Sequence, residues 1–207
     1  SNRRFKNRFI PFAIINPTYA GWKHDIDICV NKFGMKGIRL YPKYHDYEII
    51  DPSCIELVEI ARDYNLPVAF SLRIVDSRQR SWMDMDGNWD VYSFKEWRLK
   101  DIVPIIKKVP DAKYMILNIA NNGNMSDEEL ETLKNSNALF DTSGRAISKM
   151  KDYLEKFGKE KFAFGTHSPI LDYLTGLLRI ESLWEKEADE ETKELLRSGN
   201  AKRILGL

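Results

Sequence analysis

The sequence of 207 residues predicts an α/β protein built on a parallel β-sheet. Six short apolar segments alternate with helical segments, and most of the connections between them are short. This alternation is typical of βαβ units, whose strands run parallel. A (β/α)8 barrel and an open doubly wound sheet both fit the pattern, and counting elements does not separate them. The length suits one domain over residues 1–207.

The first three strands are predicted from continuous apolar runs, as expected for strands that are covered on both faces. They span residues 9–15, 37–41 and 66–71. The helix between the first two carries an apolar stripe from Trp22 to Phe33. The next helix is predicted to begin at Asp51-Pro52, a typical cap followed by a first-turn proline.

A long irregular segment, residues 73–94, follows the third strand and contains Trp82, Trp89 and Tyr92. Loops of this length in compact domains are usually functional or disordered. The aromatic residues favour a folded lid over the site, and a purely structural loop pinned by tryptophans is the alternative.

The fourth and fifth strands are predicted at residues 113–118 and 138–141. A helix over about 94–109 precedes the fourth strand, and Ser126 opens a capping box before the next helix. The helix after the fifth strand ends at Gly158.

The sixth strand, residues 161–165, leads into Thr166-His167-Ser168-Pro169. Ser168 is predicted to cap a long helix that begins at Pro169 and ends near Trp184. A strand end that feeds a helix is where α/β proteins place their chemistry. His167 is therefore the first candidate for a functional residue.

The composition excludes several classes of partner. The net charge is +1, with acidic and basic residues interspersed, which argues against nucleic acid. No apolar run approaches the roughly 20 residues of a membrane span. Cys29 and Cys54 lie among apolar residues, which indicates free thiols and, with no signal peptide at the start, a cytoplasmic protein. A small molecule remains as the expected ligand.

Polar residues at the strand ends form a candidate site. If the sheet is a barrel, Arg39, Ser71, Asn118 and His167 face one mouth. His167 is the candidate general acid or base, because imidazole exchanges protons near neutral pH. The competing interpretation is a structural histidine.

The expected substrate contacts are two arginines and three further polar residues. Arg39 and Arg73 suit a carboxylate or sugar acid, because guanidinium binds such groups bidentately. Tyr41, Ser71 and Asn118 are predicted to line the substrate site. The alternative for Arg39 is an ion pair with Asp141, whose Asp-Thr-Ser sequence is expected to fix the loop by side-chain caps.

Several segments in their order and spacing resemble the amidohydrolase-related (amidohydrolase 2 type) metal-dependent hydrolases. This TIM-barrel family includes many carboxylate decarboxylases and lactonases. The resemblance runs from about Phe9 to the end of the chain. The matching segments are Phe12–Pro17, Gly34–Pro42, Asn65–Val68, Phe140–Gly144, Phe164–Thr166 and Gly199–Leu207.

The resemblance also implies a degenerate metal site. The family begins its ligand set with His-x-His on the first strand, and this chain has no such pair. The family's later histidines match Ser71 and Asn118, and its aspartate matches His167. Serine and asparagine are poor zinc ligands, so no cofactor is expected. Zinc is the alternative if a His-x-His pair precedes the chain in the natural protein.

The first strand of this chain resembles the family's third, so the first one or two βα units are expected to be missing. Six strands do not close an ordinary eight-stranded barrel. Three explanations remain: the units precede this chain in a longer protein, the open edge pairs as a homodimer, or a smaller barrel closes. The first is the expected one, because an apolar edge strand invites aggregation.

The resemblance implies a hydrolase, or a lyase such as a decarboxylase, that acts on a small carboxylate- or sugar-like substrate. A non-catalytic small-molecule-binding protein of the same fold is the alternative. A metal-free enzyme that uses His167 and Arg39 is a third possibility.

Overall fold

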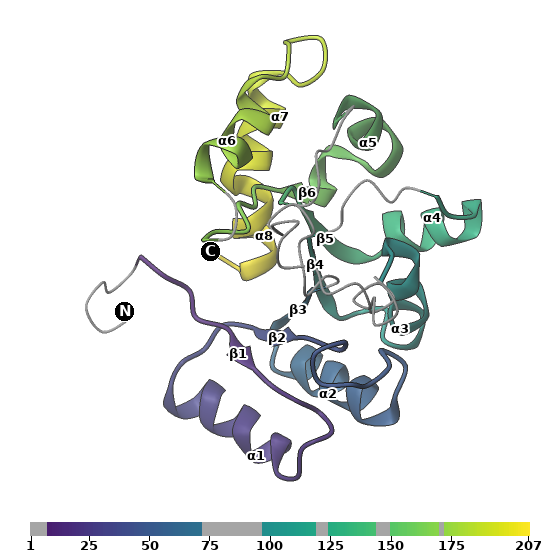
Figure 1. Cartoon of the computed structure of the whole chain (residues 1–207), viewed down its shortest axis with the longest axis vertical. Coiled ribbons are helices and arrows are strands. Elements are labelled where there is room, and N and C mark those ends of the chain that lie inside the picture. The colour runs from purple at the N-terminus through teal and green to yellow at the C-terminus, as the bar shows by residue number, and fades with distance from the viewer. Residues whose placement is uncertain (1–7, 72–96, 119–123, 144–149, 170–171) are drawn as a thin grey trace, which may run out of the picture.

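The structure is a computed structural model, and it describes residues 8–71, 97–118, 124–143, 150–169 and 172–207. Its centre is a single six-stranded sheet in which every paired strand is parallel to its neighbour (Figure 1). The strands are β1 (Ala13–Ile14), β2 (Ile38–Leu40), β3 (Pro67–Ser71), β4 (Lys113–Leu117), β5 (Asn137–Asp141) and β6 (Phe162–Ala163).

The strand order identifies the architecture. The order is β1-β2-β3-β4-β5-β6, so strands that are consecutive in sequence are neighbours in the sheet. A doubly wound sheet instead reverses direction at a switch point. The doubly wound alternative is therefore wrong, and the sheet is the wall of a partial (β/α)-barrel. Within the described ranges, β1 and β6 each have one edge without a strand partner.

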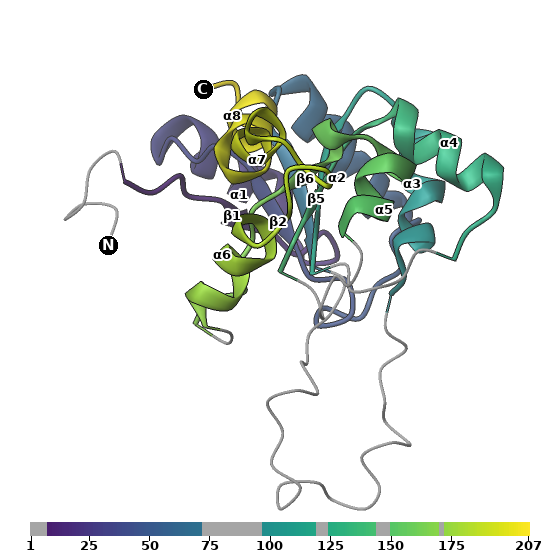
Figure 2. The same ribbon diagram turned by 90° about the horizontal axis from the view of Figure 1, so that it is seen from above.

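Five helices follow the outer side of this wall in chain order, as Figures 1 and 2 show from two directions. They are α1 (Trp22–Asp27), α2 (Pro52–Asp63), α3 (Val103–Lys108), α4 (Asp127–Asn135) and α5 (Met150–Phe157). The last three helices are α6 (Tyr173–Glu181), α7 (Glu190–Glu194) and α8 (Asn200–Leu205). No helix in the described part of the chain is long and apolar enough to cross a membrane.

Both faces of the central strands are covered, which explains their continuous apolar sequences. Phe70, Tyr114 and Phe140 are fully buried in the main core, which includes residues of the outer helices. Leu139 and Ala163 belong to a second cluster with Ile204 of α8. The helix α8 therefore packs on the face of the sheet opposite to the outer helices.

Asn200, at the first position of α8, holds that helix against the sheet. Its Nδ2 donates hydrogen bonds to the carbonyl oxygens of Lys159 (2.8 Å) and Phe162 (2.9 Å). The side chain is buried, and both of its donor bonds are satisfied. This anchor fixes the end of the chain to the start of β6.

The first strand is shorter than the sequence predicts. Only Ala13–Ile14 pairs as β1, whereas residues 9–15 were expected. Pro11 accepts a backbone hydrogen bond from Lys36 but has no N–H to donate, so ladder pairing does not continue through it. Phe9 and Ile10, before this proline, are exposed.

The two cysteines are free thiols, as the sequence predicts. Cys54 is buried in α2. Cys29 is only half-buried, because it lies in the short π-helical extension of α1 (Ile28–Lys32).

Candidate functional site

Five polar residues lie within four residues of the carboxyl ends of the strands. Arg39 is the central residue of β2, and Ser71 and Asp141 end β3 and β5. Asn118 directly follows β4, and His167 lies four residues beyond β6. Because all six strands are parallel, these residues lie at the same end of the sheet, where the strands terminate. Barrel enzymes carry their active sites at this end. We call it the strand-end edge, or simply the edge, to distinguish it from the unpaired sides of β1 and β6.

Arg39 is held in a defined orientation by two neighbours. Its Nε donates a hydrogen bond to Ser71 Oγ at 3.1 Å, and its Cζ lies 5.0 Å from the centre of the Tyr41 ring. The register places Arg39 beside Ala69, so Ser71 lies two residues further along the same face of the neighbouring strand. Within the described residues, Nη1 and Nη2 of Arg39 make no hydrogen bond, so its terminal fork remains available to a ligand.

The predicted ion pair between Arg39 and Asp141 is therefore not the contact that the structure shows. Asp141 Oδ1 accepts a hydrogen bond from the Asn118 backbone N–H at 2.6 Å. Its Oδ2 accepts one from Ser143 Oγ at 2.6 Å, as expected for a capping carboxylate. Both carboxylate oxygens of Asp141 thus accept hydrogen bonds from residues at the ends of β4 and β5, and Arg39 is bonded to Ser71.

Burial raises the pKa of Asp141 above its ordinary value. The hydrogen bonds from Ser143 and Asn118 oppose this shift, and so does the electrostatic effect of His167. His167 therefore acts on the Asp141 carboxyl group through electrostatics. The two residues form the ionisable part of the site.

A close approach of two strand ends brings His167 to this position. A Cβ on Gly165 would lie 2.7 Å from Asp141 Oδ2, so only glycine fits there. Gly165 N also donates to Thr142 Oγ1 at 3.2 Å. These contacts join the end of β5 to the segment that carries His167.

Two site residues adopt left-handed backbone conformations, with φ of 60° at Asn118 and 54° at His167. This region is uncommon for residues other than glycine, although asparagine and histidine enter it more readily than most. Such conformations cluster at functional sites. The sequence did not predict them, and no single residue type signals them reliably.

Asn118 has an unsatisfied amide. The residue is buried, and within the described structure neither Oδ1 nor Nδ2 has a hydrogen-bond partner. Buried polar groups normally find partners, and an exception needs an explanation. A bound molecule with both an acceptor and a donor would supply it.

The helix predicted from Pro169 begins later. Its first residue is Tyr173, and Asp172 Oδ1 caps it by accepting a hydrogen bond from Leu174 N at 2.7 Å. Ser168 N instead donates to Thr166 Oγ1, so Ser168 belongs to a turn. The cap prediction was wrong because the chain turns at Ser168 and the helix starts only after Asp172, which serves equally well as a cap. His167 therefore lies in a connecting segment and not at a helix N-terminus.

Other predicted site elements are placed only in part. Tyr41 lies against Arg39, as a substrate-lining residue would. Arg73 and the expected lid, residues 73–94, lie outside the described residues. Their roles stay predictions.

The fold and the edge define a partial (β/α)-barrel protein with its polar site at the carboxyl ends of the strands. A family model described as amidohydrolase matches residues 3–207. The chain belongs to this amidohydrolase family. No curated protein matches the chain.

Several solved structures share the fold. An uncharacterised TIM-barrel protein from Bordetella bronchiseptica has a TM-score of 0.70 and 14% identity, covering 99% of this chain and 69% of that one. The 5-carboxyvanillate decarboxylase from Sphingomonas paucimobilis has a TM-score of 0.73 and 14% identity, covering 100% and 69%. A dihydroxybenzoic acid decarboxylase from Polaromonas, solved with manganese and 2-nitroresorcinol, has a TM-score of 0.68 and 15% identity, covering 100% and 71%. At these identities the likeness establishes the fold alone.

The described residues do not form a set of ligands suited to a catalytic metal ion. No three His, Cys, Asp or Glu side chains come together among them. Only Asp141 and His167 at the edge carry strong ligand groups, and the Asp141 oxygens already accept hydrogen bonds. Ser71 and Asn118 offer a hydroxyl and an amide, which bind zinc poorly as replacements for imidazole.

Proposed function

We propose that this chain binds a small organic carboxylate at the strand-end edge and acts on it as a hydrolase or a decarboxylase. The observation that carries the proposal is the orientation of Arg39. Ser71 and Tyr41 hold the guanidinium, while its Nη1 and Nη2 are unused within the described residues. A guanidinium fork that is already oriented binds a carboxylate with two parallel hydrogen bonds.

The other edge residues supply complementary groups. The unsatisfied amide of Asn118 offers one acceptor and a donor group to a neighbouring hydroxyl or carbonyl of the substrate. His167 would move the proton, since imidazole gives and takes protons near neutral pH. Asp141 is the acidic group that interacts with His167. A sugar acid, which has a carboxylate beside hydroxyl groups, fits this set as well as an aromatic acid.

The fold neighbours are compatible with this substrate class. The two decarboxylases named above act, by their names, on aromatic acids. At 14–15% identity they do not identify the substrate of this chain. The argument for a carboxylate therefore rests on Arg39.

The test is a comparison of Arg39→Met with Arg62→Met. Arg62 pairs with Asp63 on the surface of α2 and does not belong to the edge, so it is the matched control. The full chain is given a panel of hydroxybenzoates, sugar acids, lactones and amides, and turnover and binding are measured. Arg39→Met is expected to weaken carboxylate binding about 10- to 100-fold, the value of charge-assisted hydrogen bonds. Equal binding by the two variants would refute the proposal.

A non-catalytic binding protein is the second candidate, and the poor fit of the donor set to a metal favours it. Turnover of any panel compound that is lost in His167→Ala would exclude this candidate. Turnover that survives dialysis against a chelator would identify a metal-free enzyme. Zinc, manganese or iron retained at one equivalent after the same dialysis would contradict a degenerate metal site.

A further inference from the structure

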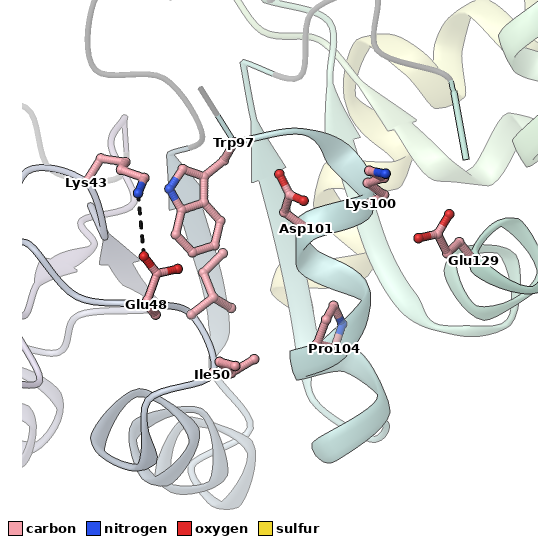
Figure 3. Close-up of a pocket in the computed structure, with 9 residues that line it drawn as sticks. Lys43, Glu48, Ile50, Trp97, Lys100, Asp101, Pro104 and Glu129 are labelled. Atoms are coloured by element: carbon pink, nitrogen blue, oxygen red, sulfur yellow. Dashed lines mark ion pairs between the residues drawn. The ribbon is translucent and has the colours of Figure 1, made fainter. Parts of the chain in front are cut away.

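A separate cavity lies on the helical side of the sheet, between the loop after β2 and the segment that leads into α3 (Figure 3). Its volume is about 360 Å³, which is within the range of small-molecule pockets. Ile50, Pro104 and the ring of Trp97 contribute apolar surface. Lys43 and Lys100 lie on opposite sides of it (Figure 3). We call it the Trp97 cavity.

The Trp97 cavity contains two hydrogen-bond donors that face each other. Trp97 is 8% exposed, and its Nε1 has no partner within the described structure. Figure 3 shows Nε1 on the side of the indole that faces the Lys43 ammonium. Lys43 Nζ lies 5.1 Å from the centre of the indole ring. It forms an ion pair with Glu48 at 3.7 Å (Figure 3), a distance too long for a hydrogen bond, so its N–H donors stay unused within the described residues.

On the side of the cavity opposite Lys43, the Lys100 ammonium is a third unused donor. Within the described residues Lys100 makes no ion pair, although it lies near Glu129. The acidic groups there have other roles. Asp101 Oδ2 accepts from Arg98 N and Glu129 Oε2 accepts from Ser126 N, each at 2.7 Å, and both bonds cap helices. The cavity therefore has hydrogen-bond donors to spare, while Asp101 and Glu129 cap helices and Glu48 is ion-paired with Lys43.

We propose that the Trp97 cavity is a second ligand site, which binds a small carboxylate with an apolar body. The carboxylate lies between Lys43 Nζ and Trp97 Nε1, supplies the acceptor that Trp97 Nε1 lacks, and gives Lys43 a hydrogen bond in addition to its long ion pair with Glu48. The apolar body lies against Ile50 and Pro104. A cationic ligand could approach the lining carboxylates of Glu48, Asp101 and Glu129, but it would leave Trp97 Nε1 without an acceptor, which is the reason we prefer a carboxylate.

This site is distinct from the edge. Arg39, Ser71, Asn118 and His167 are not among the residues that line the cavity. The proposal does not depend on the proposed function, and substitution of Arg39 separates the two.

The experiment titrates benzoate into the full chain and follows the indole N–H signals by NMR, with the Trp97 signal assigned by Trp97→Phe. We expect this signal to shift and saturate. Lys43→Gln is expected to weaken the response about tenfold, through loss of a charge-assisted contact. Arg39→Met should leave it unchanged. Lys23→Gln is the matched control, because Lys23 also stacks on a tryptophan, Trp22, at 5.4 Å.

Three results would overturn the proposal. The first is a Trp97 signal that benzoate does not move. The second is an equal response in Lys43→Gln and in Lys23→Gln. The third is an equal response to uncharged benzamide, which would mean that the cavity takes only the ring. Lys43 and Lys23 are not core residues, so these tests stand even if Trp97→Phe folds poorly.

Discussion

The Asp141 carboxylate accepts a hydrogen bond from the Asn118 backbone N–H at 2.6 Å, and this contact joins the ends of β4 and β5. It engages the backbone N–H of Asn118, which has a left-handed conformation, while the side-chain amide of Asn118 has no partner within the described residues. A carboxylate that is not itself exposed thereby holds a site residue on the neighbouring strand.

Replacing Asp141 with alanine is expected to destabilise the fold by about 2–4 kcal/mol, because two buried donors lose their acceptor. These donors are Asn118 N–H and Ser143 Oγ–H. The free energy of unfolding in urea measures the effect. Asp63→Ala removes an exposed carboxylate that pairs with Arg62, and it should cost less than 1 kcal/mol. Similar losses in both variants would contradict the structural role of Asp141.

The pH dependence of stability should carry a contribution from Asp141. Burial raises its pKa in the folded state, so between about 3.9, the ordinary value, and the raised value the folded chain binds more protons than the unfolded chain. Its contribution is therefore greatest at low pH and is lost as pH rises through this window. The difference in unfolding free energy between the wild type and Asp141→Asn should fall with rising pH. A difference that rises instead would show that the hydrogen bonds outweigh burial.

Gly165→Ala should disturb the site directly. The new Cβ would lie 2.7 Å from Asp141 Oδ2, and we expect a loss of about 1–3 kcal/mol, typical of overpacking. Gly199→Ala is the control, since its Cβ would meet the end of the flexible Leu195 side chain at 3.1 Å. Thermal unfolding of both variants measures the difference. Equal unfolding temperatures for the two variants would show that β5 and the His167 segment are not tightly packed.

The cysteines should differ in reactivity. Burial raises the pKa of Cys54 to about 12, so its reactive thiolate is scarce at neutral pH. Cys29 is half-buried, and burial raises its pKa less than that of Cys54. Mass spectrometry after brief treatment with a thiol reagent should find the label on Cys29, and on Cys54 only in denaturant. Early labelling of Cys54 would contradict the packing of α2.

The sequence predicted the central strands well because their apolar runs are bounded by clear turn signals. It predicted β3 to end at Ser71 and β4 to end near Asn118, within one residue of the observed limits. Local chemistry misled where two caps competed, at Ser168 and Asp172. The partner of Arg39 was missed because it depends on the register of β2 against β3, which no local pattern encodes.

The candidate site was predicted as a set of strand ends, and the structure places Arg39, Ser71, Asn118 and His167 at one edge. The conformations of these residues were not foreseen. The left-handed φ at Asn118 accompanies a contact with Asp141, 23 residues away, and the tolerance of asparagine for this conformation is too weak a signal to predict it. The Trp97 cavity was missed for a similar reason, because its walls come from three separate segments.

The uninterrupted strand order also bears on how the chain assembles. Each strand pairs with the next strand along the chain, and the longest connection between neighbours is the one from β3 to β4, residues 72–112. The entropy lost on closing a loop grows with its length, and local contacts form fastest. The wall is expected to grow unit by unit from any starting pair, while α8, docked on β5 and β6, joins once those two strands are in place.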